Sequence, residues 1–205
     1  MAQVSLTGKT LQHGIDHLIE TDSDLARLVS ELGNPPLWAR EPGFPTLVHI
    51  ILEQQVSLAS ARAAFNRITG AAGRLTPERL LDFADNDLKG FGFSRQKTRY
   101  CRELAQAILR KNLDLGGLDT LDDQTVRARL MEIKGIGPWT ADIYLLMALL
   151  RPDIWPTGDL ALAVAVQRIK LMPARPDEET LSRIADPWRP WRAVAARILW
   201  HYYLK

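Results

Sequence analysis

The sequence predicts an all-α protein. Apolar residues recur at intervals of three and four along nearly every periodic segment, and no run alternates between apolar and polar residues as a half-buried strand does. Hydrophobic residues make up 46% and charged residues 24% of the chain, which are values typical of globular proteins and exclude disorder along the whole chain. The chain holds no run of roughly 18 consecutive apolar residues, the length that marks a membrane-spanning helix, so we expect no association with a membrane.

Start and stop signals divide the periodic segments into individual helices. Thr76-Pro77 is typical of an N-cap followed by proline at the first helical position, and Ser94 can cap the helix after Phe93. Pro138 can open a helix directly after Gly137. Loops rich in proline and glycine are expected near 34–43, 151–158 and 173–176. The helices are expected over residues 8–20, 23–32, 45–54, 57–70, 77–84, 94–111, 122–132, 138–150, 159–170, 177–185 and 189–203.

Charge is unevenly distributed along the chain, although the net charge is only +2. Residues 1–34 hold two basic and five acidic side chains, whereas residues 86–112 hold seven basic and two acidic ones. A local basic block can bind a polyanion such as nucleic acid even where the total charge is small. A solvated helix face would give the same pattern, so charge alone leaves both interpretations open.

The chain has a single cysteine, Cys101. One cysteine excludes an intramolecular disulfide, a cysteine-based zinc site and a cysteine-ligated iron–sulfur cluster. The first 20 residues lack the charged segment and apolar core of a secretion signal. Together these observations predict a cytoplasmic protein.

The most specific segment is LMEIKGIGPWTAD, residues 130–142. We expect Gly135 and Gly137 to allow a sharp turn with positive φ, and to leave the backbone amides open to a ligand. Those amides precede a helix, where an anion is favoured, and Lys134 adds a positive charge. Ile136 can plug the space between the two helices. The segment therefore predicts a site for a nucleic-acid phosphate, bound without regard to base, although an ordinary helical corner with a glycine cap is the alternative.

This segment resembles the helix-hairpin-helix motif of DNA repair proteins. The following stretch RPDIWPTGDLALAV (151–164) is similar to the Gly/Pro-rich loop and aspartate of the helix-hairpin-helix-GPD DNA glycosylase superfamily. Residues 44–68, 90–108 and 187–204 resemble its alkylation-repair branch, DNA-3-methyladenine glycosylase II, so the resemblance covers roughly residues 40–204. It implies a two-lobed helical glycosylase unit over residues 1–205 with the active-site cleft between the lobes. The chain departs from the longer members of the family in one way: they carry an extra N-terminal β domain, for which we expect no room in 205 residues.

The resemblance implies an enzyme that flips an alkylated purine, of the 3-methyladenine or 7-methylguanine type, out of duplex DNA. It would hydrolyse the N-glycosidic bond and leave an abasic site. Asp159 would be catalytic, since a carboxylate near the sugar stabilises the oxocarbenium-like transition state and can activate water. A plain N-cap for the following helix is the alternative for Asp159. Two further functions stay open: a non-catalytic DNA-binding protein and a bifunctional glycosylase/lyase.

The resemblance also assigns the residues around the flipped base. Trp139 and Trp200 would line the base pocket, because an electron-rich ring favours a cationic base. Tyr144 is a third candidate, although the family's pocket tyrosine matches Ile143 and a shift of one helical residue turns a side chain by about 100°. Gln55 would fill the space that the base leaves in the duplex.

Trp139 stands where bifunctional relatives place a catalytic lysine, so the resemblance implies a monofunctional enzyme that needs no cofactor for its chemistry. The backbone carbonyls of Met131, Ile133 and Ile136 match positions that hold a monovalent cation, Na⁺ or K⁺, in hairpins of this family. Double-stranded DNA with alkylated bases is the expected partner, and we expect a monomer.

Overall fold

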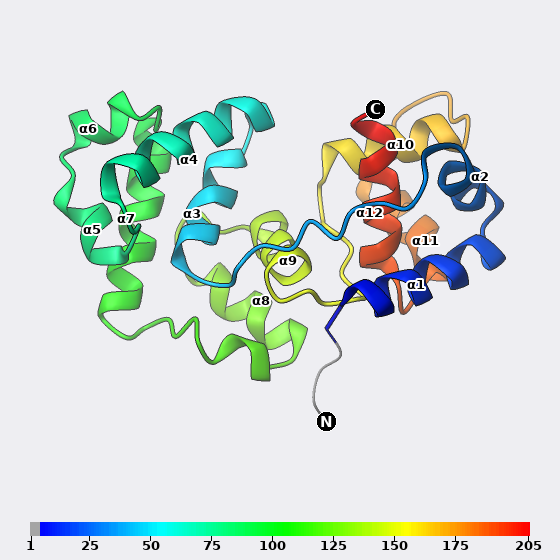
Figure 1. The fold of residues 1–205 in the computed structure, drawn as a ribbon, viewed down its shortest axis with the longest axis horizontal. Coiled ribbons are helices and arrows are strands. Elements are labelled where there is room, and N and C mark those ends of the chain that lie inside the picture. Colours follow the sequence, from blue (N-terminus) through cyan, green and yellow to red (C-terminus); the bar gives the residue numbers. More distant parts are fainter. Residues whose placement is uncertain (1–4) are drawn as a thin grey trace. The chain divides into compact units, whose positions relative to one another are not determined.

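The computed structural model describes residues 5–205, and every regular element within that range is a helix (Figure 1). This confirms the all-α prediction. None of the described helices is long and apolar enough to cross a membrane.

All eleven predicted helices are present, with ends shifted by at most three residues. One α-helix, α6, and two short 3-10 helices were not predicted. The α-helices are α1 (Gly8–Thr21), α2 (Ser23–Leu32), α3 (Phe44–Glu53), α4 (Leu58–Ala72), α5 (Pro77–Asp82), α6 (Asp85–Gly90), α7 (Arg95–Leu109), α8 (Asp123–Met131), α9 (Pro138–Met147), α10 (Leu160–Ile169), α11 (Glu178–Ala185) and α12 (Arg192–Tyr203). The 3-10 helices are η1 (Leu118–Thr120) and η2 (Asp186–Trp188).

The chain forms two compact units. Unit 1 combines the residues up to Ala39 with Leu145–Lys205, and unit 2 is the continuous segment Arg40–Tyr144. The division falls inside α9, between Tyr144 and Leu145. The expectation of an active-site cleft between two lobes stays a prediction.

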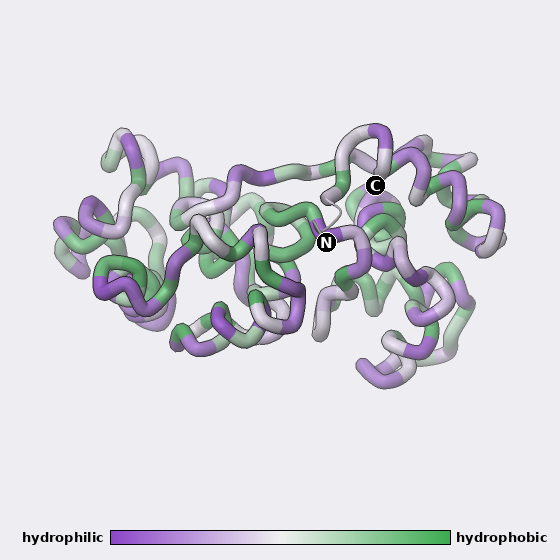
Figure 2. The backbone as a smooth tube through the Cα atoms, turned by 90° about the horizontal axis from the view of Figure 1, so that it is seen from below, coloured by the Kyte–Doolittle hydropathy of each residue, from purple (hydrophilic) through white to green (hydrophobic). Residues whose placement is uncertain are grey.

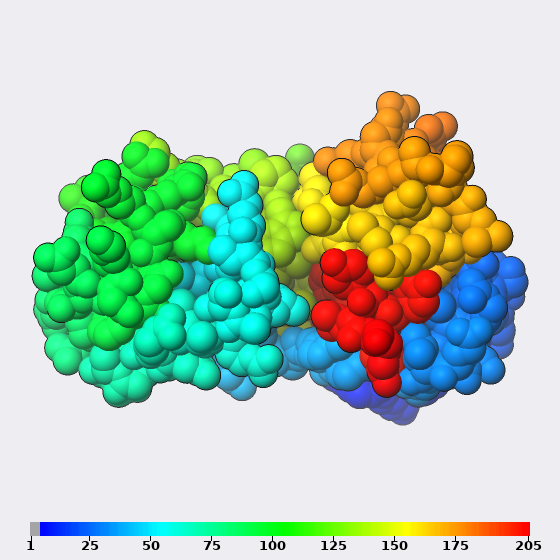
Figure 3. Space-filling view, turned by 90° about the horizontal axis from the view of Figure 1, so that it is seen from above, coloured from blue at the N-terminus to red at the C-terminus, as the bar shows by residue number. Residues whose placement is uncertain are grey.

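Unit 1 is built around α12, which packs against α1, α2 and α10. Figure 3 shows the C-terminal residues, in red, beside the N-terminal residues, in blue. Gly14 allows α1 to approach this helix closely, because an added Cβ atom would lie 2.8 Å from the Trp191 ring and 2.9 Å from Val194. The N-terminal segment of the chain is therefore an integral part of the C-terminal unit.

Arg197 is a fully buried charge in the middle of α12. Its guanidinium donates to the carbonyls of Leu37, Ala193 and Leu146, at 2.8, 2.9 and 2.8 Å. Burial lowers the pKa of Arg197 to about 10, so the side chain is still charged at neutral pH. Three separate segments of unit 1 are joined through this one side chain.

We expect Arg197→Met to reduce the free energy of unfolding by about 2–5 kcal/mol, because buried carbonyls lose their donor. Urea unfolding followed by circular dichroism measures the change. Arg183→Met is the matched control, since Arg183 is exposed on α11 and most exposed substitutions change stability by less than about 0.5 kcal/mol. Equal unfolding midpoints for the two variants would contradict the role given to Arg197.

Unit 2 has α3 at its core. The sequence FPTLVHIILE is apolar on almost every side, and seven of its ten residues are buried, as expected for a helix that other elements surround. α4 and α7 pack on α3, and α5 packs on α7. These outer helices carry mixed sequences, and Figure 2 shows hydrophilic and hydrophobic residues interleaved along their coils. Cys101 lies buried on the inner face of α7, where burial raises the pKa of its thiol.

Candidate functional site

The hairpin forms between α8 and α9, where the sequence predicts it. Gly135 has φ +96°, and an added Cβ atom would lie 2.1 Å from Cγ of the Tyr100 ring. Glycine is thus required at this position both by the backbone angle and by the tyrosine packed against it. The expectation of positive φ is wrong for Gly137, whose φ is not positive. A Cβ atom at Gly137 would meet no described atom within 4 Å, so the backbone there is open to an approaching ligand.

The two arms of the hairpin are joined on the inside. Ile136 is buried, as expected of a plug, and its amide donates to the carbonyl of Ile133 at 3.0 Å. The Arg127 guanidinium on α8 donates to the fully buried carboxylate of Asp142 on α9, at 2.7 Å from Nε. Lys134 is exposed at the turn. The hairpin therefore has a fixed interior and a basic, open exterior.

Gln54 connects this hairpin to the end of α3. Its Nε2 donates to the Gly135 carbonyl at 2.9 Å and to the Thr140 hydroxyl at 2.8 Å. Gln54 was not among the residues predicted for the site, and the one signal for it in the sequence is the Gln-Gln pair at the end of an apolar helix. Its neighbour Gln55 is exposed and has φ +56°, a conformation that few residues other than glycine adopt. Backbone strain of this kind is common at functional sites. Gln54 thereby fixes the Gln55 turn beside the hairpin.

Asp159 lies in unit 1 as the N-cap of α10, and its side chain is 8% exposed. Oδ1 accepts from the Leu162 amide at 2.9 Å and from the Trp200 indole Nε1 at 3.2 Å. The capping interpretation from the sequence is therefore correct, but the cap is not the only structural role of this carboxylate. An indole from α12, 41 residues away, holds one of its oxygens in place.

The aromatic residues expected around the base have different surroundings. Trp139 is half-buried at the start of α9 in unit 2, and Trp200 is 7% exposed in unit 1. Tyr144 has no exposed surface, its hydroxyl accepts from the Gly43 amide at 3.0 Å, and burial raises its pKa. The expected pocket role of Tyr144 does not match this placement, because its ring is enclosed in the packed core. Ile143 is buried as well.

The carbonyls expected to hold a monovalent cation belong to the turn of the hairpin. Met131 is the last residue of α8, so its carbonyl lies among those that an α-helix leaves without a partner in the helix. The carbonyl of Ile133 accepts the Ile136 amide and retains a second lone pair. This donor set suits Na⁺ or K⁺, and the cation stays a prediction.

The glycine turn between α8 and α9, with Lys134 beside it, is a helix-hairpin-helix motif in an all-helical fold. Asp159 is held at the start of α10, the helix that follows the motif. A sequence model of the HhH-GPD superfamily of base excision DNA repair proteins matches residues 48–190. The chain belongs to this superfamily.

Named relatives are similar over most of the chain. A putative DNA-3-methyladenine glycosylase YfjP of Bacillus subtilis is 27% identical over 93% of this chain and 68% of its own length. DNA-3-methyladenine glycosylase 1 of Schizosaccharomyces pombe is 28% identical over 90% of this chain and 84% of its own length. The solved structure of the S. pombe 3-methyladenine DNA glycosylase Mag1 in complex with abasic DNA matches with a TM-score of 0.83 and 28% identity. That match covers 92% of this chain and 95% of the other.

Proposed function

We propose that this protein is a monofunctional DNA glycosylase that removes alkylated purines, of the 3-methyladenine or 7-methylguanine type, from duplex DNA. The observation that carries the proposal is the Asp159 carboxylate, fixed by the Leu162 amide and the Trp200 indole after a helix-hairpin-helix motif. The names of the relatives, and the abasic DNA bound in the Mag1 structure, support the same substrate class.

Asp159 supplies the group that glycosidic cleavage requires. The sugar becomes positively charged as the base departs, and a carboxylate fixed near it stabilises that charge without reorganising. The same carboxylate can orient the attacking water or accept its proton. An N-alkylated purine already carries positive charge, so it leaves readily and needs little help from a general acid.

The DNA-binding parts of the proposal lie in unit 2. The open backbone at Gly137 and the exposed Lys134 suit a phosphate at the start of α9. Gln55 would occupy the space left by the flipped base, and its strained turn is fixed through Gln54. Trp139 would stack on the base, and an indole there cannot form the Schiff base of a strand-cleaving enzyme.

Base release from modified duplexes tests the proposal. We expect the protein to release 3-methyladenine and 7-methylguanine as free bases, and to leave sites that break only after heat or alkali. Separate duplexes with hypoxanthine, ethenoadenine or 1-methyladenine define the substrate range. Strand breaks without alkali would indicate a lyase instead. Binding without release of any base would indicate a non-catalytic DNA-binding protein.

A further inference from the structure

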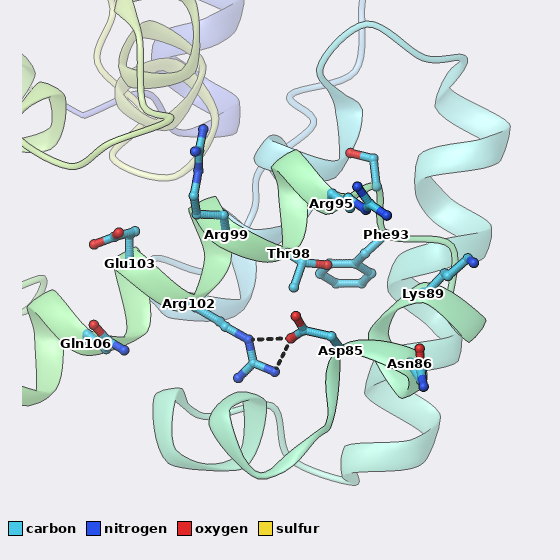
Figure 4. A pocket seen from close by; sticks show the side chains of 11 residues that line it. Asp85, Asn86, Lys89, Phe93, Arg95, Thr98, Arg99, Arg102, Glu103 and Gln106 are labelled. Atoms are coloured by element: carbon cyan, nitrogen blue, oxygen red, sulfur yellow. Dashed lines mark hydrogen bonds and ion pairs between the residues drawn. The ribbon is translucent and has the colours of Figure 1, made fainter.

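A second polar surface lies in unit 2, away from the hairpin turn itself. A cleft of about 640 Å³ opens between α6 and the face of α7 that runs from Arg95 to Gln106 (Figure 4). We call it the α6–α7 cleft. Its charged lining residues are Asp85 and Lys89 of α6 and Arg95, Arg99, Arg102 and Glu103 of α7. It contains much of the basic block that the sequence analysis identified at residues 86–112.

One ion pair inside the cleft is structural. The Arg102 guanidinium donates to Oδ1 of Asp85 at 3.1 Å from Nε and 2.7 Å from Nη2, as Figure 4 shows. Its Nη2 also donates to the Phe83 carbonyl at 2.7 Å, so Arg102 fixes the loop between α5 and α6. The charges of Asp85 and Arg102 therefore cancel, so the remaining lining residues determine the net charge of the cleft.

Those remaining residues make the cleft positive. Lys89, Arg95 and Arg99 are exposed, and among residues 5–205 no carboxylate lies within 4.0 Å of their charged nitrogens. Glu103 is the single acidic lining residue outside the structural pair. Three solvated cations against one carboxylate suit a ligand with several negative charges spaced along its length, such as a phosphodiester chain.

Tyr100 follows Arg99, a lining residue of the cleft, and its ring packs against the hairpin. The Arg99 guanidinium carbon lies 5.6 Å from the centre of the Tyr100 ring, and that ring packs against Gly135. The Gln96 side chain, which donates to the Tyr100 hydroxyl at 2.6 Å, lowers the pKa of Tyr100, and the charges of Arg99 and Lys134 lower it further. Tyr100 thus lies near both Lys134 of the hairpin and Arg99 of the cleft.

We propose that the α6–α7 cleft binds the phosphate backbone of the same DNA duplex that the hairpin holds. This inference rests on the proposed function, because it requires duplex DNA at the hairpin. Lys89, Arg95 and Arg99 extend the contact along the backbone beyond the damaged site. The contact is independent of sequence and of damage, so it contributes to binding of undamaged DNA and to the salt dependence of the affinity.

The test compares salt dependence in two matched triple variants. The cleft variant carries Lys89→Gln, Arg95→Gln and Arg99→Gln, and the control variant carries Arg74→Gln, Arg110→Gln and Lys111→Gln. All six side chains are exposed, and the control residues do not line the cleft. Each phosphate contact adds about 0.9 to the slope of log affinity against log salt, so the cleft variant should lose about 2–3 of that slope. The control variant should keep the wild-type slope, and equal slopes in the two variants would overturn the proposal.

Duplex length separates one bound duplex from other ligands. A stable abasic analogue fixes the register of the duplex, which is then shortened from either end. We expect the difference between wild type and the cleft variant to vanish when the duplex is shortened on one side only. A difference that survives on the shortest duplex, or one that inorganic phosphate at millimolar concentration removes, would assign the cleft to a small phosphate ligand and overturn the proposal.

Base release keeps this test separate from the proposed function. At saturating DNA in single-turnover conditions, the control variant should release alkylated bases within about twofold of the wild-type rate, because its three substitutions lie outside the cleft. The salt slope measures DNA binding, so it can be compared between the variants even if the protein releases no base. A failure of the cleft proposal can therefore be distinguished from a failure of the proposed function.

Discussion

Replacing Asp159 with asparagine is expected to lower the rate of base release by about 10²–10⁴-fold, the range typical for loss of a catalytic acid–base or charge-stabilising group. Asparagine removes the negative charge and keeps a side-chain oxygen in the same place. That oxygen can still accept from the Leu162 amide and the Trp200 indole. Since asparagine is also a good N-cap, the start of α10 should stay intact.

The measurements are the single-turnover rate of base release, the affinity for duplex DNA and the melting temperature. We expect the first to collapse while the other two stay near wild-type values. Asp177→Asn is the matched control, because Asp177 caps α11 through the Thr180 amide in the same way. That variant should release bases at the wild-type rate. An Asp159→Asn protein that retained a tenth of the wild-type rate would contradict a catalytic role.

Comparing Asp159→Ala with Asp159→Asn separates the effect of the negative charge from the effect of the hydrogen bonds that the side chain accepts. Asp159→Ala removes the cap, at a cost of about 0.5–2 kcal/mol, and leaves the buried Trp200 indole without this acceptor. We therefore expect Asp159→Ala to lose both activity and stability, whereas Asp159→Asn loses activity alone. Equal destabilisation of both variants would mean that the charge of Asp159, rather than its hydrogen-bonding geometry, stabilises unit 1.

Local signals account for what the sequence predicted well. Helix signals in a sequence act within about one turn, and the structure confirms two of them directly. Ser94 is the N-cap of α7, and Pro138 is the first residue of α9. α5 and α6 are both only six residues long, and less than two turns of periodicity does not separate either of them from a loop. α5 was predicted because Thr76-Pro77 is a local start signal, whereas α6 was missed because Ala84, the residue before it, offers no side-chain cap.

Contacts between distant residues account for what the sequence could not show. The bond between Trp200 and Asp159, and those of Gln54 to the hairpin, join residues 41 and 81 or more positions apart. Arg197 reads as a surface charge, since arginine is rarely fully buried, and its carbonyl partners leave no trace in composition. Gln55 gave no sign of positive φ, because glutamine is not a residue that turns favour.

The second large effect is expected in the hairpin, where Gly135 and Gly137 look alike in the sequence but differ in the structure. Gly135→Ala is expected to destabilise unit 2 and to lower DNA affinity by at least about tenfold, which corresponds to about 1.4 kcal/mol. A side chain at φ +96° costs about 1–3 kcal/mol in backbone strain, and the new methyl group would also collide with the Tyr100 ring. Displacing that ring disturbs the turn that presents the amides of the hairpin.

Gly137→Ala, unlike Gly135→Ala, should leave the stability of the protein unchanged in the absence of DNA. Its φ is not positive and its Cβ position is open, so we expect little change in unfolding midpoint. If a phosphate approaches the backbone there, the methyl group occupies its path, and the affinity for DNA should fall while stability is kept. Wild-type affinity in Gly137→Ala would show that the backbone at this position does not contact DNA.

A double-variant cycle resolves the two costs at Gly135. Combining Gly135→Ala with Tyr100→Ala removes the ring that the methyl group meets, but it leaves the backbone strain in place. The double variant should therefore recover part of the stability that Gly135→Ala loses, and the coupling energy measures the collision alone. Full additivity of the two substitutions would mean that the collision is relieved by a small shift of the ring. The loss in Gly135→Ala would then be due to the positive φ of this position alone.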